Sequence, residues 1–291
     1  MRTTESISYR ILLDNVRMLN AQLARASEQV SSGKKYSHLH EAPSHGAEML
    51  ELQDQLADLD QYQSNADSTG FFIKVTESTL GSIYNIVSAV FTQGSSAASG
   101  SNSETSRAAF ASEIRSLRDQ LFSLANTEVN GRYIFAGSLV TQPAYVMEGD
   151  AITYQGNTEM NTIDIGASLQ VQQNLPGSPA LDPMFASVNS LLSAVESGDQ
   201  TAMQAALGQF SGALSTINQA RARVGVDLGK IEDAEFARGQ QQTYIETRQS
   251  AVGDADLSEA IVKLNQAQAA LEAALTTGSL IGQKNLFDYI G

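Results

Sequence analysis

Apolar residues recur at alternating spacings of three and four near both ends of the chain. This spacing predicts two long amphipathic helices. The first stripe comprises Tyr9, Leu12, Val16, Leu19, Leu23, Ala26 and Val30. The second comprises Leu257, Ile261, Leu264, Leu271 and Leu275, with Gln268 in a polar seam position. Because more than two hundred residues separate the stripes, we expect the chain to leave a coiled-coil base formed by its ends and then return to it.

Further helical patterns fill much of the interval between the ends. One runs from Gly46 to about Val90, and another, spaced four-three-four-three, covers residues 110–124 after a small polar turn at residues 94–103. A short helix near residues 184–195 ends at Gly198, and Asp199 is placed to cap the next one. That last pattern extends, with a possible break, to about Gln249. The resulting prediction is a set of antiparallel helices.

The period changes to two in the middle of the chain. Residues 152–154, 162–165 and 169–172 have strand character, and four of the five prolines lie between residues 143 and 183. The predicted fold class is therefore mainly α, with long antiparallel coiled-coil helices formed by both chain ends and a small inserted β-rich outer domain. The expected domains are residues 1–45 with 250–291, residues 46–135 with 184–249, and residues 136–183.

The two ends also differ in charge. Residues 1–40 carry six Lys or Arg against three acids, net +3, whereas residues 250–291 carry five acids against two Lys, net −3. This asymmetry would favour pairing of the ends, although exposed ion pairs contribute only about 0 to 1 kcal/mol each. The alternative interpretation is that these charges form the solvated face of each helix.

Composition excludes several functional classes. A net charge of −14 argues against nucleic-acid binding, which needs a basic patch. The chain has no Cys, so disulfides, thiol catalysis and thiolate metal sites are absent. We also expect no membrane insertion and no Sec signal peptide, because the chain lacks both a run of about 20 apolar residues and an apolar leader with a cleavage site.

The three histidines, His38, His40 and His45, form a cluster that could bind metal. In a zinc-protease helix two His stand four apart, so that both rings point at one metal ion. Here His40 and His45 are five apart, which turns the second ring by about 140°, and Pro43 disfavours a helix. A surface loop is therefore favoured over a metal site. We predict no enzyme activity and no cofactor, since no nucleophile elbow or phosphate-binding loop is present.

Four segments together resemble the bacterial flagellin superfamily, and within it the hook-filament junction proteins. They are residues 30–34 (Val-Ser-Ser-Gly-Lys), 129–138, 254–257 (Asp-Ala-Asp-Leu) and 285–290 (Asn-Leu-Phe-Asp-Tyr-Ile). The family motif in the second segment comprises Asn130, Gly131, Arg132, Tyr133, Phe135 and Gly137. The chain departs from the family where Glu41 and Ala42 precede Pro43, since a double Asp is usual there.

The resemblance implies a structural flagellar protein, exported without a Sec signal by the flagellar type III apparatus and assembled outside the cell as a ring joining hook to filament. Its partners would be copies of itself, a neighbouring hook-associated protein, flagellin and an export chaperone. The alternatives are a filament flagellin and a cytoplasmic coiled-coil adaptor. The expected assembly interface comprises Leu12, Val16, Leu19, Leu23, Val30, Leu257, Ile261, Leu264, Leu271, Leu275, Leu286 and Phe287.

Overall fold

The computed structural model describes the backbone of residues 2–36, 42–99 and 102–290. Side chains are described for residue 7 and for residues 9–36, 42–99 and 102–280. The chain forms two compact units, residues 1–58 with 241–291 and residues 59–240. The β-rich segment belongs to the same unit as most of the two longest helices, so the three-domain division of the sequence analysis stays a prediction.

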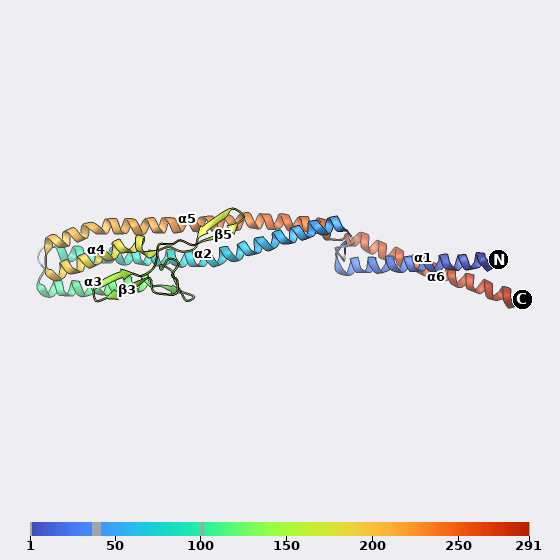
Figure 1. Cartoon of the computed structure of the whole chain (residues 1–291), viewed down its shortest axis with the longest axis horizontal. Coiled ribbons are helices and arrows are strands. Elements are labelled where there is room, and N and C mark those ends of the chain that lie inside the picture. Colours follow the sequence, from blue (N-terminus) through green and yellow to red (C-terminus); the bar gives the residue numbers. More distant parts are fainter. Residues whose placement is uncertain (1, 37–41, 100–101, 291) are drawn as a thin grey trace. The chain divides into compact units, whose positions relative to one another are not determined.

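The first unit is built on α1 (Arg2–Ser32) and α6 (Leu257–Ile290), which lie side by side (Figure 1). They run antiparallel. Lys34 Nζ lies 2.7 Å from Asp254 Oδ1 just beyond one end of the pair, and Leu12 contacts Gly278 near the other. A Cβ at Gly278 would stand 2.8 Å from Leu12 Cδ2, so the helices approach closely there. The predicted helical pairing of the two chain ends is confirmed.

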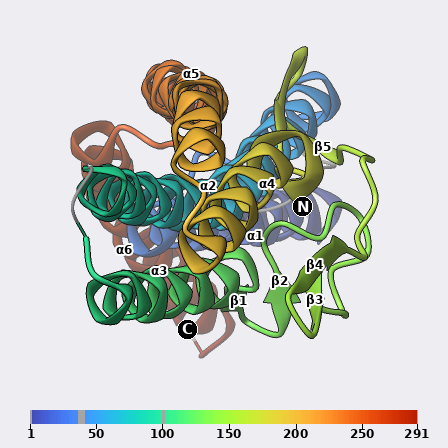
Figure 2. The same cartoon turned by 90° about the vertical axis from the view of Figure 1, so that its left-hand side faces the viewer.

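The second unit contains most of α2 (Pro43–Ala98) and α5 (Gln200–Gly253), together with α3 (Glu104–Ala125) and α4 (Gly177–Ser197). Viewed along the helices, α2 and α4 lie between α5 and α3 (Figure 2). The shared core includes Leu80, Ile83, Met184, Leu191 and Phe210, each of which is fully buried. Three helices differ from the sequence analysis. α2 runs to Ala98, through part of the turn predicted at residues 94–103. α5 continues without the possible break, and α4 begins at Gly177, well before residue 184.

The predicted helix ends are confirmed at four positions. Gly33 and Gly198 adopt the left-handed conformation, with φ of 68° and 75°, which suits glycine after a helix. Asp199 Oδ1 accepts two backbone N–H bonds at 2.9 and 3.0 Å at the start of α5. Asp256 Oδ1 does the same for α6 at 2.9 and 3.1 Å. These caps satisfy backbone groups that have no partner within the helix.

The β-rich segment consists of three separate two-stranded antiparallel hairpins in the described chain. β1 (Glu128–Val129) pairs with β2 (Arg132–Tyr133), β3 (Tyr145–Glu148) with β4 (Ala151–Tyr154), and β5 (Thr162–Gly166) with β6 (Leu169–Gln172). The predicted strands at residues 152–154, 162–165 and 169–172 are therefore confirmed. An isolated hairpin is marginally stable in water, so each must be held by the helices.

Tyr145 anchors this segment to α3 and α4. Its side chain is 1% exposed, and its backbone N–H and C=O both bond the side chain of Asn126, at 2.8 and 2.9 Å. Its hydroxyl donates to Asp182 Oδ1 at 2.7 Å. Burial, followed by this hydrogen bond, raises the pKa of the Tyr145 phenol above its ordinary value, so the hydroxyl remains a donor. One residue thus joins a strand to two helices.

The motif at residues 129–138 turns the chain out of α3. Asn130 and Gly131 form the β1–β2 turn with φ of 52° and 77°. Phe135 is fully buried, and its carbonyl accepts a 2.8 Å bond from the N–H of Gly177 at the start of α4. Gly137 has φ of 71°, and a Cβ there would lie 2.2 Å from Asn157 O. The motif therefore fixes the start of the β-rich segment.

We predict that Gly137→Ala destabilises the second unit much more than Gly131→Ala. Both positions have positive φ, which costs an L-residue about 1–2 kcal/mol. Only at position 137 would the methyl group also collide with backbone, which adds about 1–3 kcal/mol. Urea unfolding followed by circular dichroism measures both changes. Equal losses of unfolding free energy in the two variants would show that the close contact with Asn157 is not rigid.

Candidate assembly site

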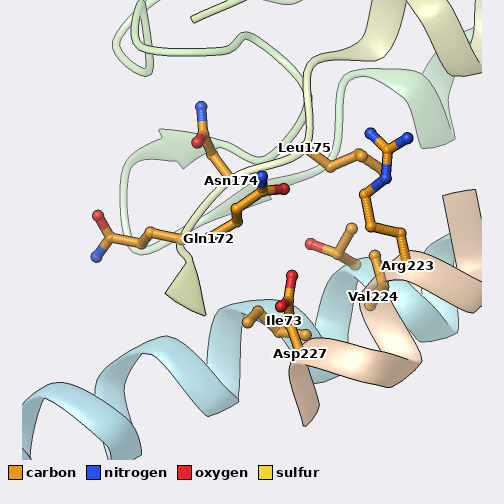
Figure 3. A pocket seen from close by; sticks show the side chains of 9 residues that line it. Ile73, Gln172, Asn174, Leu175, Arg223, Val224 and Asp227 are labelled. Atoms are coloured by element: carbon orange, nitrogen blue, oxygen red, sulfur yellow. The ribbon is translucent and has the colours of Figure 1, made fainter. Parts of the chain in front are cut away.

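A small cavity lies where β6 faces α2 and α5 in the second unit (Figure 3). Ile73, Gln172, Leu175, Arg223 and Asp227 are among its lining residues, and its volume is about 20 Å³. That is room for about one water molecule, whereas small-molecule sites occupy about 300–1,000 Å³. Asp227 also accepts a 2.7 Å bond from Lys230 Nζ, so its charge is balanced. This cavity cannot hold an organic substrate.

Of the three clustered histidines, the structure describes His45. His38 and His40 lie outside the described residues. The ring of His45 lies 5.5 Å from that of Tyr36, and its Nδ1 is 3.5 Å from Ser44 Oγ. Among the described residues, no group of three or more His, Cys, Asp or Glu is placed to hold a metal ion. Within the same residues, no helix is long and apolar enough to cross a membrane.

The predicted interface residues of α1 form its contact with α6. Ala26 is 5% exposed, and five neighbours on the same stripe are half-buried: Leu12, Val16, Leu19, Leu23 and Val30. The opposing side of α6 alternates small and large residues. This buried or half-buried side comprises Ala260, Leu264, Ala267, Leu271, Ala274 and Gly278. The small residues let α1 approach closely, as at Gly278.

Three predicted interface residues on α6 remain exposed. Leu257, Ile261 and Leu275 are 49%, 46% and 55% exposed, because they lie beside the α1 contact rather than within it. Gln268 is exposed with them. Leu286 and Phe287 lie on α6, but their side chains fall outside the described ones. The two chain ends therefore use only part of the predicted apolar surface against each other.

A second apolar stripe, which the sequence analysis missed, lies on α1. Ile7, Ile11 and Met18 are spaced by four and seven, which places them on one face away from Leu12 and Val16. Their exposed fractions are 55%, 55% and 54%. Spacing alone could have found this stripe. Of the eighteen large hydrophobic residues exposed in the described chain, ten lie on α1 and α6, which have 31 and 34 residues.

Electrostatic contact between the ends is limited. Lys34 and Asp254 form the described ion pair that links them, and hydrogen bonds first from Lys34 and then from Ser250 lower the pKa of the Asp254 carboxyl. The described pairs within the terminal helices join residues three or four apart, as in Arg17 with Asp14. Most charges at the ends thus form a solvated face, and apolar contact supplies the stability.

Comparison with known proteins gives a consistent result at the sequence level. Residues 5–139 match the bacterial flagellin N-terminal helical region. The chain is 26% identical to flagellar hook-associated protein 3 of Escherichia coli strain K12, covering 94% of this chain and 95% of that protein. It is 21% identical to the Salmonella typhimurium protein of the same name, over 99% of both. A flagellin of Clostridium tyrobutyricum is 26% identical over 44% of this chain and 34% of its own length.

Solved structures show the same fold. A putative flagellar hook-associated protein from Vibrio parahaemolyticus superposes with a TM-score of 0.69 at 18% identity, over 74% of this chain and 100% of that one. The flagellar junction protein FlgL from Legionella pneumophila gives 0.61 at 15% identity, over 70% and 99%. The resemblance to the bacterial flagellin superfamily is thus confirmed: the chain contains a flagellin N-terminal helical region and is similar over nearly its whole length to flagellar hook-associated protein 3.

Proposed function

We propose that this chain is a structural subunit of the bacterial flagellum that joins the hook to the filament as a ring of subunits. The two relatives named flagellar hook-associated protein 3 match over 95% and 99% of their own length, whereas the flagellin matches over 34%. The observation that carries the proposal is the unused apolar surface of α1 and α6. The proposed role is structural and involves no catalysis.

That surface needs partners. Burying one large apolar side chain contributes about 1.5–3 kcal/mol, and soluble monomers rarely expose long contiguous apolar stripes. The α6 residues Leu257, Ile261 and Leu275 lie beside the contact between the helices, whereas the α1 stripe Ile7–Ile11–Met18 lies on the side of α1 away from Leu12 and Val16, so each helix offers an exposed apolar stripe of its own. A subunit with two unlike contact faces assembles head to tail, and such contacts close into a ring when the rotation allows.

The same surface explains the expected partners and route. In the proposal the chain leaves the cell through the flagellar type III apparatus and functions outside it. An export chaperone covers the apolar stripes of the terminal helices until assembly. In the flagellum, a neighbouring hook-associated protein and flagellin then contact the ends of the ring. The entropic cost of ordering the terminal helices is offset by the burial of their apolar surface against these neighbours.

A filament flagellin is the second candidate. The match of residues 5–139 to the flagellin N-terminal region favours it, because that region is shared with filament subunits. Both functions would use the same terminal helices. Copy number separates them, since a filament contains vastly more subunits than a junction.

We expect purified hook-plus-filament structures to contain a small, fixed number of copies of this chain per hook. Quantitative mass spectrometry against the hook subunit and the flagellin measures that ratio. An excess comparable to flagellin would identify a filament subunit instead. Absence from the structures, with the chain retained in the cytoplasm, would support a coiled-coil adaptor.

We also expect Ile261→Asp to lower incorporation into these structures by roughly tenfold or more, because about 1.4 kcal/mol of lost contact energy is already a tenfold effect. Ile261 is exposed in the single chain, so helix content measured by circular dichroism should not change. The control is Leu139→Asp, which places the same charge at a residue of the β-rich segment that is 41% exposed. Normal incorporation of the Ile261 variant would remove this face of α6 from the interface.

A further inference from the structure

Two helix segments of the second unit carry no charged residue. Residues 78–98 of α2 and residues 200–220 of α5 contain no Asp, Glu, Lys or Arg, although the whole chain is 17% charged. Soluble surfaces usually carry about 25–35% charged residues, and charge is depleted where proteins bind one another. Both segments contribute many exposed positions, so the missing charge is a property of the surface.

The two segments lie beside each other over the same length of the bundle. At one end Gln200 Nε2 donates to the carbonyl of Ala98 at 3.2 Å. At the other end Arg221 Nη2 bonds Glu77 Oε1 at 2.6 Å, and charge resumes there. The segments therefore run antiparallel between these two anchors, and each residue of one has a counterpart at matching height on the other.

Each segment presents a stripe that points away from the core. The α2 stripe comprises six exposed residues, Ser78, Ser82, Asn85, Ala89, Thr92 and Ser96. The α5 stripe comprises Thr201, Gln204, Gly208, Gly212, Ser215 and Gln219, all exposed. The opposite sides of the same helices hold buried residues such as Val87 and Ile217. Two narrow, uncharged faces result, one on each helix.

Several hydroxyl groups on these faces already have partners within their own helix. Ser82 Oγ donates to the Ser78 carbonyl at 3.1 Å, and Thr92 and Ser96 likewise bond carbonyls four residues earlier at 3.0 Å. On α5, Gln219 Nε2 donates to Ser215 Oγ at 3.4 Å. A buried polar group is costly mainly when its hydrogen bond is unmade. Removing water from these faces on binding therefore costs little free energy.

Gly208 and Gly212 add a reason for close contact. A Cβ at either position would meet nothing within 4 Å, so the packing of the single chain does not require glycine there. Glycine inside a helix costs about 0.5–1 kcal/mol relative to alanine. Glycine also allows another backbone to approach closely. Because Gly208 and Gly212 have no side chains, a neighbouring helix can approach the backbone of the α5 stripe closely.

We infer that in the assembled structure the α5 stripe of one copy packs against the α2 stripe of the next copy. This inference rests on the proposed function. A second copy is the fitting occupant because both stripes stand at the same height. A rotation about an axis parallel to the helices, without a shift, brings one against the other. An uncharged face also favours an uncharged partner face, since a charge on the partner would be buried there without an opposite charge, which is costly.

The area of the two faces is too small for a stable interface between two free chains. A 21-residue helix segment is about 30 Å long and about 10 Å wide, or roughly 300 Å² per partner. Stable interfaces bury about 800 Å² per partner. The stripe contact therefore does not hold two free chains together. It acts inside the assembly, where the terminal helices already hold neighbours close.

The test is cross-linking in assembled flagellar structures. The chain has no Cys, so Asn85→Cys with Gly212→Cys places one thiol on each stripe at matching height. The variant replaces the chain in its source bacterium, and the isolated structures are treated with a short bismaleimide. We expect a ladder of cross-linked oligomers. Each single variant should give no ladder, and neither should Glu113→Cys with Gly212→Cys, which moves one thiol to the exposed side of α3.

The outcomes separate the inference from the proposed function. A chain that is present in the structures but stays monomeric after cross-linking overturns the stripe contact alone. Dimers from a single variant would indicate like-with-like pairing and would also overturn it. If mass spectrometry finds no chain in structures from the unsubstituted strain, the proposed function fails instead.

A charge placed on the stripe gives an independent result. We expect Ser215→Asp to lower incorporation at least tenfold, whereas Ser116→Asp, the same change at an exposed residue of α3, should incorporate normally. Circular dichroism of both purified chains confirms that each is folded. Equal incorporation of the two variants would show that the α5 stripe is not buried in the assembly.

Discussion

The structure depends on one constraint: α1 and α6 carry more apolar surface than either can bury against the other. Their mutual contact takes the side of α6 that alternates Ala and Leu, together with one stripe of α1. Leu257, Ile261 and Leu275 stay outside that contact, as do Ile7 and Ile11. Covering this remainder requires other molecules. The proposed function therefore rests on the apolar surface that these two helices leave exposed, rather than on a pocket.

The second unit holds its β hairpins through contacts within the unit. Its β hairpins are too small to be stable alone, but Tyr145 and Asn126 tie them to the helices through buried hydrogen bonds. Arg118, whose side chain is 4% exposed, holds the β3–β4 turn to α3 through Asp150 at 2.7 Å. The hydrogen bond from Arg118 lowers the pKa of the Asp150 carboxyl. In the proposed assembly, this compact unit would present a preformed surface to its neighbours.

The sequence predicts the helices well and their contacts less well. Heptad spacing identifies α1 and α6, and the predicted Leu264 and Leu271 lie on the contact side of α6, but the most buried residues there are Ala260 and Ala267. Alanine is too weakly apolar to mark it, so the spacing of the leucines assigns three exposed residues to the same seam. The start of α4 was predicted too late because Pro179 and Pro183 indicate a break. Pro179 lies in the first turn, where a missing N–H costs no helical bond, and burial of Leu181 and Met184 supports the rest. The pairing of the strands depends on tertiary anchors such as Tyr145, which no local pattern reveals.

Charge completes the physical account. The chain carries a net charge of −14, so copies held side by side repel one another over most of their length. The surfaces assigned to contact are those where charge is sparse or missing: the apolar stripes of α1 and α6, and residues 78–98 and 200–220 in the second unit. In the proposed ring, repulsion between acidic faces then disfavours pairings that bring such faces together. In this proposal, affinity comes from the apolar ends, and the uncharged faces set which side of one copy meets which side of the next.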